Sequence, residues 1–179
     1  MPRLFIAVDL PSDIQTTLPS LCQGLPGVRW LAPGHLHLTI RFIGEVDGGM
    51  STAIRDGLTG GGLAAFACQL KGVGCFPSRG RPRVLWAGVQ AEAGLFCLQA
   101  QVESALRRLG LPPEGKKFRP HITLTRLKAA PPPAAITEYL ATHNQFQSAA
   151  FPVTRFHLYS SLLTAEGAIH RREHSYPLG

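Results

Sequence analysis

The chain has 179 residues, of which 45% are hydrophobic and 16% are charged. This length is typical of a single domain, and the composition excludes a disordered chain, which combines low hydrophobicity with high net charge. The 18 basic and 11 acidic side chains give a net charge of +7, which favours a polyanionic partner such as nucleic acid. The first apolar run ends at Asp9, and none reaches the roughly 18 residues of a membrane span. We therefore expect a cytoplasmic protein with no membrane partner.

The first half of the chain alternates strand and helix patterns. In chain order it predicts a strand (4–8), a helix (12–25), a strand (36–43), a helix (50–58) and an extended segment (66–76). Ser12 is the expected N-cap of the first helix. Gly72 and Gly74 are candidate bulge positions, because glycine inside a strand often marks a bulge.

The second half alternates in the same way. In chain order it predicts a strand (84–89), a helix (95–109), a strand (119–126), a helix (134–142) and a strand (151–161), followed by a weaker strand pattern (168–178). Apolar residues recur at helical spacing through the first of these helices, and Gly110 follows directly as a stop signal.

The two halves therefore repeat one order of elements, at an offset of about 80 to 85 residues. At the third element both carry a His-x-Thr signature: His-Leu-Thr-Ile over 37–40 and His-Ile-Thr-Leu over 121–124. A duplicated β-α-β-α-β unit predicts one domain (1–179) of two lobes related by a pseudo-twofold axis. The lobes would span approximately 1–78 and 79–179.

The repeated signature places chemistry-bearing side chains together. On a strand, residues i and i+2 share a face, so His37 projects with Thr39, and His121 projects with Thr123. If the lobes pack about the pseudo-twofold, two imidazoles and two hydroxyls surround one cleft. One neutral imidazole can take a proton while a protonated one gives a proton, because a reference pKa of about 6.5 leaves both forms accessible. The hydroxyls can hold a phosphate, so this chemistry needs no metal and no cofactor.

Strict alternation also assigns the neighbouring side chains to faces. It places Arg41 on the face of His37 and Phe42 on the buried face, and it places Thr125 on the face of His121. We expect His35 at the rim of the cleft.

The histidine motifs extend to longer sequences, over residues 37–44 and 118–126, that resemble the paired signatures of the 2H phosphoesterase superfamily. More closely, the chain resembles the LigT-like RNA 2',3'-cyclic phosphodiesterases, historically called 2'-5' RNA ligases. The segments Arg-Leu-Phe-Ile-Ala-Val (3–8) and Pro-Arg-Val-Leu-Trp (82–86) are similar to that family too. The likeness covers nearly the whole chain.

The resemblance implies a two-lobed α+β fold with mainly antiparallel sheets that flank a central cleft. It implies His37 and His121 as the catalytic pair, with Thr39 and Thr123 binding the phosphate and Arg126 nearby. The implied reaction opens a 2',3'-cyclic phosphate at an RNA end to a 2'-phosphate by attack of water. We expect a monomer, with His37 as the acid and His121 as the base, although the sequence does not fix that direction.

Two alternatives remain open at this point. The same site would serve 2'-5' RNA joining, or the opening of a cyclic phosphate on a small nucleotide. The chain would otherwise be a non-catalytic RNA-binding module that uses only its basic loops, such as the arginine-rich segment 79–83. The sequence also has His170 where the family often has a tyrosine, which leaves the role of that position open.

Overall fold

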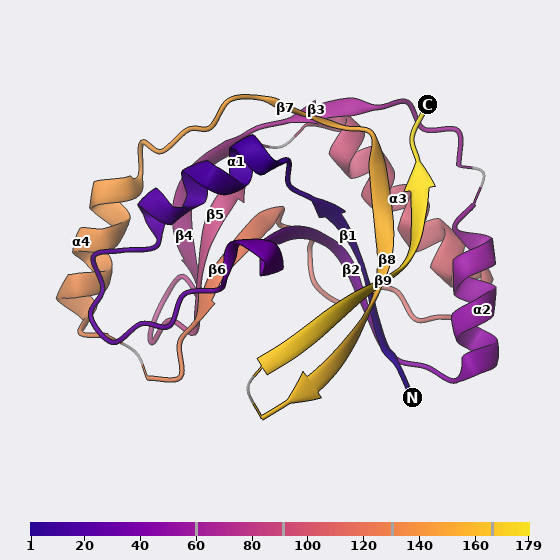
Figure 1. The fold of residues 1–179 in the computed structure, drawn as a ribbon, viewed down its shortest axis with the longest axis horizontal. Coiled ribbons are helices and arrows are strands. Elements are labelled where there is room, and N and C mark those ends of the chain that lie inside the picture. Colours follow the sequence, from indigo (N-terminus) through magenta and orange to yellow (C-terminus); the bar gives the residue numbers. More distant parts are fainter. Residues whose placement is uncertain (60, 91, 130, 166) are drawn as a thin grey trace.

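The protein is an α+β structure built on one large antiparallel sheet (Figure 1). The computed structural model describes residues 1–59, 61–90, 92–129, 131–165 and 167–179. These residues form nine strands and four α-helices, which confirms the predicted fold class. Within the same residues, no helix combines the length and the apolar character needed to cross a bilayer.

Every predicted element is present in chain order. The first half contains β1 (Arg3–Asp9), α1 (Ser12–Thr17), β2 (His37–Glu45), α2 (Gly48–Gly57), β3 (Phe66–Cys68) and β4 (Leu70–Phe76). The second half contains β5 (Val84–Val89), α3 (Ala93–Arg108), β6 (His121–Arg126), α4 (Pro133–His143), β7 (Phe151–Val153), β8 (Arg155–Thr164) and β9 (Gly167–Pro177). The repeat includes a further detail: the last extended segment of each half is divided into two strands, β3 and β4 in the first half and β7 and β8 in the second.

The first helix is shorter than predicted. It ends at Thr17 and continues as a 3₁₀ turn over Leu18–Leu21, with Pro19 at the start of that turn. Proline lacks the N–H that a continuing α-helix needs, so the helical pattern over 12–25 does not form one α-helix. The expected cap was also wrong, because Pro11 rather than Ser12 is the N-cap residue.

The two candidate glycines of β4 have different roles. The register between β4 and β5 shifts between Leu70 and Val73, and Gly72 lies there with a φ of 67°, so the predicted bulge at Gly72 is confirmed. Gly74 is instead paired in register with Trp86. A Cβ at Gly74 would lie 2.2 Å from the Trp86 ring, so this glycine makes room for the indole.

Strand pairing interleaves the two halves of the sequence. The order in the main sheet is β4-β5-β6-β2-β1-β8-β9. The first half's β4 pairs with β5, and the second half's β8 pairs with β1. The other two strand pairings between halves, β2 with β6 and β3 with β7, join equivalent elements, as a pseudo-twofold axis requires. The half of the sheet that contains β4, β5 and β6, and the half that contains β2, β1, β8 and β9, thus each combine strands from before and after position 78.

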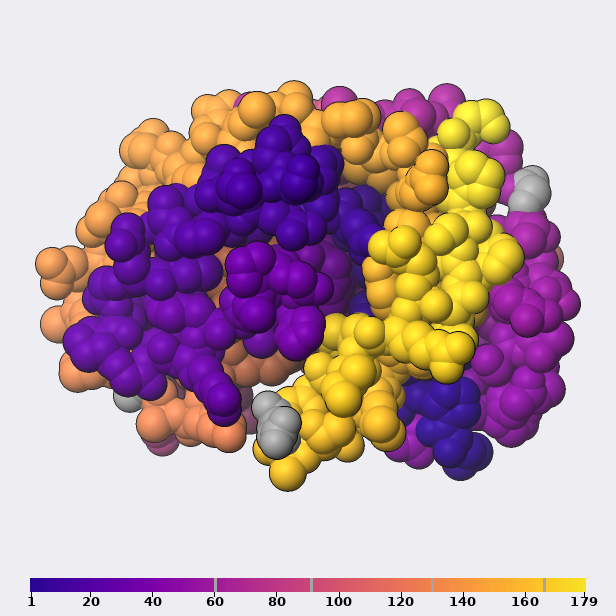
Figure 2. Space-filling model, in the orientation of Figure 1, coloured from indigo at the N-terminus to yellow at the C-terminus, as the bar shows by residue number. Residues whose placement is uncertain are grey.

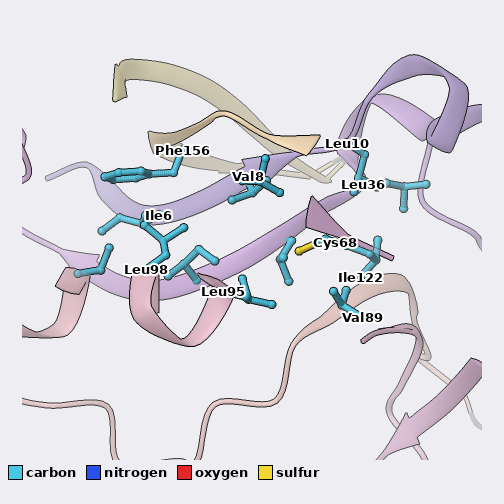
Figure 3. Close-up of a cluster of buried hydrophobic side chains, with 14 of the residues drawn as sticks. Ile6, Val8, Leu10, Leu36, Cys68, Val89, Leu95, Leu98, Ile122 and Phe156 are labelled. Carbon is cyan, nitrogen blue, oxygen red and sulfur yellow. The ribbon is translucent and has the colours of Figure 1, made fainter. Parts of the chain in front are cut away.

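The core lies on one face of this sheet, under α3. Leu95 and Leu98 point from α3 toward Ile6 of β1 (Figure 3), and all three are fully buried. Leu38 and Ile122, from the two histidine motifs, are fully buried in the same cluster. Burying each such side chain contributes about 1.5–3 kcal/mol, so the apolar positions of both motifs hold their strands against the core.

The tight contact between β4 and β5 gives a stability test. A Cβ at Gly88 would lie 2.4 Å from the backbone carbonyl oxygen of Lys71, which a side-chain movement cannot relieve. We expect Gly88→Ala to lower the free energy of unfolding by about 1–3 kcal/mol, as overpacking does. Urea unfolding measures this change. Gly115→Ala is the matched control, because its added Cβ meets no atom within 4 Å, and equal stability of the two variants would contradict the prediction.

Candidate active site

The site is defined by the way β2 and β6 cross. These antiparallel strands pair at Leu38 and Ile122, close to the first residue of each strand. The register therefore sets His37 opposite Thr123, and Thr39 opposite His121. From this overlap each strand runs away from the other, β2 along β1 and β6 along β5.

The four polar side chains of the overlap share one face of the sheet. Their apolar neighbours are buried on the opposite face, while His37, Thr39, His121 and Thr123 are half-buried. The two histidines occupy diagonal positions, which lie about 7–8 Å apart in antiparallel pairs. That separation lets two imidazoles reach one phosphate group from different sides.

Twin bulges change the faces beyond this overlap. Register shifts make Ile40 the extra residue of β2 and Leu124 the extra residue of β6. A bulge puts two consecutive side chains on one face, so strict alternation fails after it. The positions of Arg41, Phe42 and Thr125 that alternation predicts are therefore wrong.

The side chains after the bulges have exchanged faces. Arg41 turns away from the cleft and binds Glu103 of α3, with Nε 2.5 Å from Oε1. Thr125 is fully buried, and its hydroxyl donates to the carbonyl oxygen of Arg29 at 2.7 Å. Phe42 and Arg126 return to the histidine face, and Phe42 is 53% exposed there rather than packed in the core.

The ring of His121 is fixed through its Nδ1 atom. This nitrogen lies 2.6 Å from the backbone carbonyl oxygen of Arg119. A carbonyl oxygen can only accept, so Nδ1 carries the proton and Nε2 is left for proton transfer. Burial lowers the pKa of His121, the carbonyl contact opposes that effect, and the positive charge of Arg126 lowers the pKa further.

His37 is the more deeply buried of the two rings. Burial, together with the neighbouring imidazole of His170, lowers the pKa of His37 to about 4. A backbone hydrogen bond with His35 and the negative charge of Asp9 act in the opposite direction. Both histidines thus bond the backbone two residues before them, and both are neutral in the ligand-free protein at neutral pH.

A hollow of about 370 Å³ adjoins His37. It lies between the N-terminal third of the chain and the β8–β9 hairpin, where the surface in Figure 2 is hollowed. Its lining includes Phe5 and Asp9 from β1, with Tyr159 and Arg172 from the hairpin, and it stops short of His121. A second hollow of about 380 Å³, between α3 and the end of β9, lies away from both histidines.

Sequence reasoning missed four residues of the His37 side. The Phe5 ring stacks with the ring of His37, with centroids 5.1 Å apart, and with the ring of Tyr159 at 5.2 Å, and the His37 and Tyr159 centroids lie 6.5 Å apart. Asp9 and Arg172 bind each other at the edge of this stack. A polar residue that ends an apolar strand marks Asp9 in the sequence, but its partners lie about 150 residues away and follow no repeat. The expected rim position of His35 is consistent with its exposure.

The arrangement suits proton transfer around an oxyanion. Over the described ranges, no three metal-ligating side chains gather in one place. Two imidazoles, two hydroxyl donors and one guanidinium are groups that can provide an acid, a base and anion binding.

The comparisons with known proteins agree with this architecture. A family model described as the 2'-5' RNA ligase superfamily matches residues 29–164. The RNA 2',3'-cyclic phosphodiesterase of Archaeoglobus fulgidus is 33% identical over 172 residues, which cover 94% of this chain and 96% of the relative. The enzyme of that name from Thermotoga maritima is 33% identical over 175 residues, with 94% and 91% covered.

Solved structures give the same result. A protein of Thermus thermophilus superposes with a TM-score of 0.80 at 30% identity, over 98% of this chain and 97% of that one. Escherichia coli LigT complexed with 3'-AMP gives 0.75 at 27% identity, over 99% of both chains. The fold is that of the LigT-like proteins, and the expected resemblance is confirmed. The chain belongs to the 2'-5' RNA ligase superfamily.

The environment of His37 predicts an acid-sensitive protein. In the folded, ligand-free state His37 titrates at about 4, whereas an unfolded chain has its histidines near 6.5. Between these values the unfolded state binds more protons, so the free energy of unfolding falls as the pH drops from about 6.5 toward 4. Nitrogen-15 NMR of the imidazoles measures the titration, and urea unfolding measures the stability. His37→Gln is expected to weaken this pH dependence, and a His37 titration near 6.5 would contradict the prediction.

Proposed function

We propose that this protein hydrolyses 2',3'-cyclic phosphate ends of RNA to 2'-phosphomonoesters, without a metal, using His37 and His121 as an acid–base pair. The observation that supports the proposal is the overlap of β2 and β6, which puts two imidazoles and two hydroxyls on one face of the sheet. The names of the relatives from Archaeoglobus fulgidus and Thermotoga maritima support the substrate class.

The reaction follows from the placement of the four side chains. One histidine takes a proton from water as the water oxygen bonds to phosphorus. The bond from phosphorus to O3' breaks on the opposite side, and the other histidine protonates O3'. The products are a 3'-hydroxyl and a 2'-phosphate. The hydroxyls of Thr39 and Thr123 donate to the non-bridging oxygens, and Arg126 balances the negative charge that develops.

The acid needs a proton that burial disfavours. We propose His37 as the acid and His121 as the base, a direction that the sequence does not fix. In the ligand-free protein the pKa of His37 is about 4, so a further negative charge is required near neutrality. The phosphodiester supplies it, because a negative charge close to an imidazole raises its pKa. Substrate binding would thus favour protonation of His37.

The proposal includes a monomer in the cytoplasm. Both histidine strands belong to one chain, so a single copy provides the complete set of side chains. The cysteines are free thiols: Cys22, Cys68, Cys75 and Cys97. Free thiols are the usual state in a reducing compartment, which supports a cytoplasmic location.

Two other functions are separable by product analysis. In 2'-5' joining, an RNA hydroxyl would replace water as the nucleophile, and the product would be longer than the substrate. A binding module would leave the cyclic end unchanged and would lose RNA affinity as salt increases. Mass spectrometry in water labelled with oxygen-18 distinguishes these outcomes, because only hydrolysis places one labelled oxygen on the 2'-phosphate.

The central test removes each imidazole. We expect His37→Ala and His121→Ala each to lower turnover of an RNA with a 2',3'-cyclic end by about 10²- to 10⁴-fold, the usual contribution of a positioned acid or base. The double variant should lose little more, because the two groups act in one step. Turnover is followed with a fluorescent oligonucleotide.

His174→Ala is the matched control for these variants. His174 is an exposed histidine of β9 that packs on Tyr176 away from the cleft, so its removal should leave turnover unchanged. A folded double variant with wild-type turnover would overturn the proposal.

Phe42 is predicted in the core from the sequence, but its ring is exposed in the structure. Its ring lies 5.9 Å from that of Phe5, on the face that carries His37. Arg126 occupies the equivalent position beside His121. One side of the cleft therefore offers an aromatic ring and the other a positive charge, which fits a nucleobase next to a phosphate.

Removing the Phe42 ring tests that placement. Stacking of a base on an aromatic side chain contributes about 1–3 kcal/mol, so we expect Phe42→Ala to raise KM about 5- to 100-fold, more for purine than for pyrimidine ends. Turnover at saturation should change little. Phe96→Ala is the control, because Phe96 is also exposed but lies on α3 against Phe118. An unchanged KM in Phe42→Ala would rule out stacking at this ring.

A further inference from the structure

The two halves of the site differ at one position that faces a histidine. Asp9, the last residue of β1, pairs in register with His37. In the second half the residue that pairs with His121 is Gly88, in β5. The duplication thus places a carboxylate beside one histidine and no side chain at the matching place beside the other.

Polar groups from two other strands hold the Asp9 carboxylate. The hydroxyl of Tyr159 in β8 donates to Oδ1 at 2.6 Å, and the guanidinium of Arg172 in β9 pairs with Oδ2. His157 lies behind them, with Nε2 3.5 Å from Oδ2 and Nδ1 2.8 Å from the hydroxyl of Ser175. The carboxylate is therefore fixed by groups from both strands of the β8–β9 hairpin.

The same tyrosine belongs to a cluster of three stacked rings, Phe5, His37 and Tyr159. Tyr159 lies parallel to Phe5, with an interplanar angle of 12°, and Phe5 stacks on His37 at 29°. Arg172 also covers the Tyr159 ring, 5.9 Å from its centroid. Because the Tyr159 hydroxyl donates to Asp9, the carboxylate fixes a ring that stacks with both Phe5 and His37.

The negative charge of Asp9 also acts on His37, in addition to the contacts that position its ring. The groups that face His37 are the imidazoles of His35 and His170, the guanidinium of Arg172 and the carboxylate of Asp9. Asp9 is the negative member of this set, and it raises the pKa of His37 against burial and the neighbouring His170. An acid that must hold a proton near neutrality benefits from such a neighbour.

We propose that Asp9 is a positioning residue for His37, which orients the imidazole through Tyr159 and Phe5 and favours its protonated form. This role rests on the proposed function, in which His37 donates a proton to O3'. Because Gly88 occupies the matching position beside His121, the two halves of the duplicated site differ in function: the carboxylate acts on His37, the proposed acid, and has no equivalent beside His121.

The test uses Asp9→Asn, which keeps the shape and removes the charge, and Tyr159→Phe, which keeps the ring and removes the hydroxyl. We expect Asp9→Asn to lower turnover at neutral pH about 10-fold, with KM changed less than about threefold. The alkaline limb of its turnover–pH profile should move to lower pH. Tyr159→Phe should lower turnover less, and the double variant should resemble Asp9→Asn, because both changes act on one hydrogen bond: Asp9→Asn removes the charge of its acceptor and Tyr159→Phe removes its donor.

A second measurement needs no substrate. Nitrogen-15 NMR should show His37 titrating at a lower pH in Asp9→Asn than in the wild type, since a negative charge has been removed. Asp56→Asn is the control, because Asp56 is an exposed acid of α2 paired with Arg55, and it should move neither readout. A merely structural role for Asp9 would lower stability without moving the His37 titration.

The outcomes separate this inference from the proposed function. If the wild type produces no 2'-phosphate, the proposed function fails, while the NMR titration still decides whether Asp9 acts on His37. If the wild type is active and a folded Asp9→Asn matches it in turnover, pH profile and His37 titration, the role of Asp9 is overturned.

Discussion

The short overlap of β2 and β6 is the constraint on which the rest of the structure depends. The two strands meet at Leu38 and Ile122 and then run apart along β1 and β5. Because the overlap is confined to the start of each strand, the side chains that meet across it are those of the two His-x-Thr motifs. The buried leucine and isoleucine between them hold both strands on the core, so hydrophobic packing sets the geometry of a polar site.

The sequence predicted the parts of this arrangement that depend on local periodicity. Alternation around His37 and His121, and the matching order of elements in both halves, were enough to infer two strands that face one cleft. The resemblance added the family and the substrate class. Alternation failed where a bulge interrupts it, since an extra residue at Ile40 or Leu124 leaves no mark on the pattern of apolar side chains.

Contacts between distant strands could not be predicted in this way. The carboxylate of Asp9 is a single acid at a strand end, and nothing local reveals that Tyr159 and Arg172 bind it. Such networks depend on strand order and register, which a single sequence leaves undetermined. They also distinguish the two sides of the site: the carboxylate of Asp9 pairs in register with His37, whereas Gly88 occupies the matching place beside His121.

The interleaving of the two halves has a consequence for how the protein is made. During synthesis β1 emerges first, but one of its two edges is completed by β8, with Phe5 opposite Tyr159. A ribosome must therefore release most of the chain before the sheet can close. Strands this remote in sequence pair slowly, because the long intervening chain loses conformational entropy before the stabilising contact forms. The nascent first strand is thus an open edge that chaperones would be expected to shield.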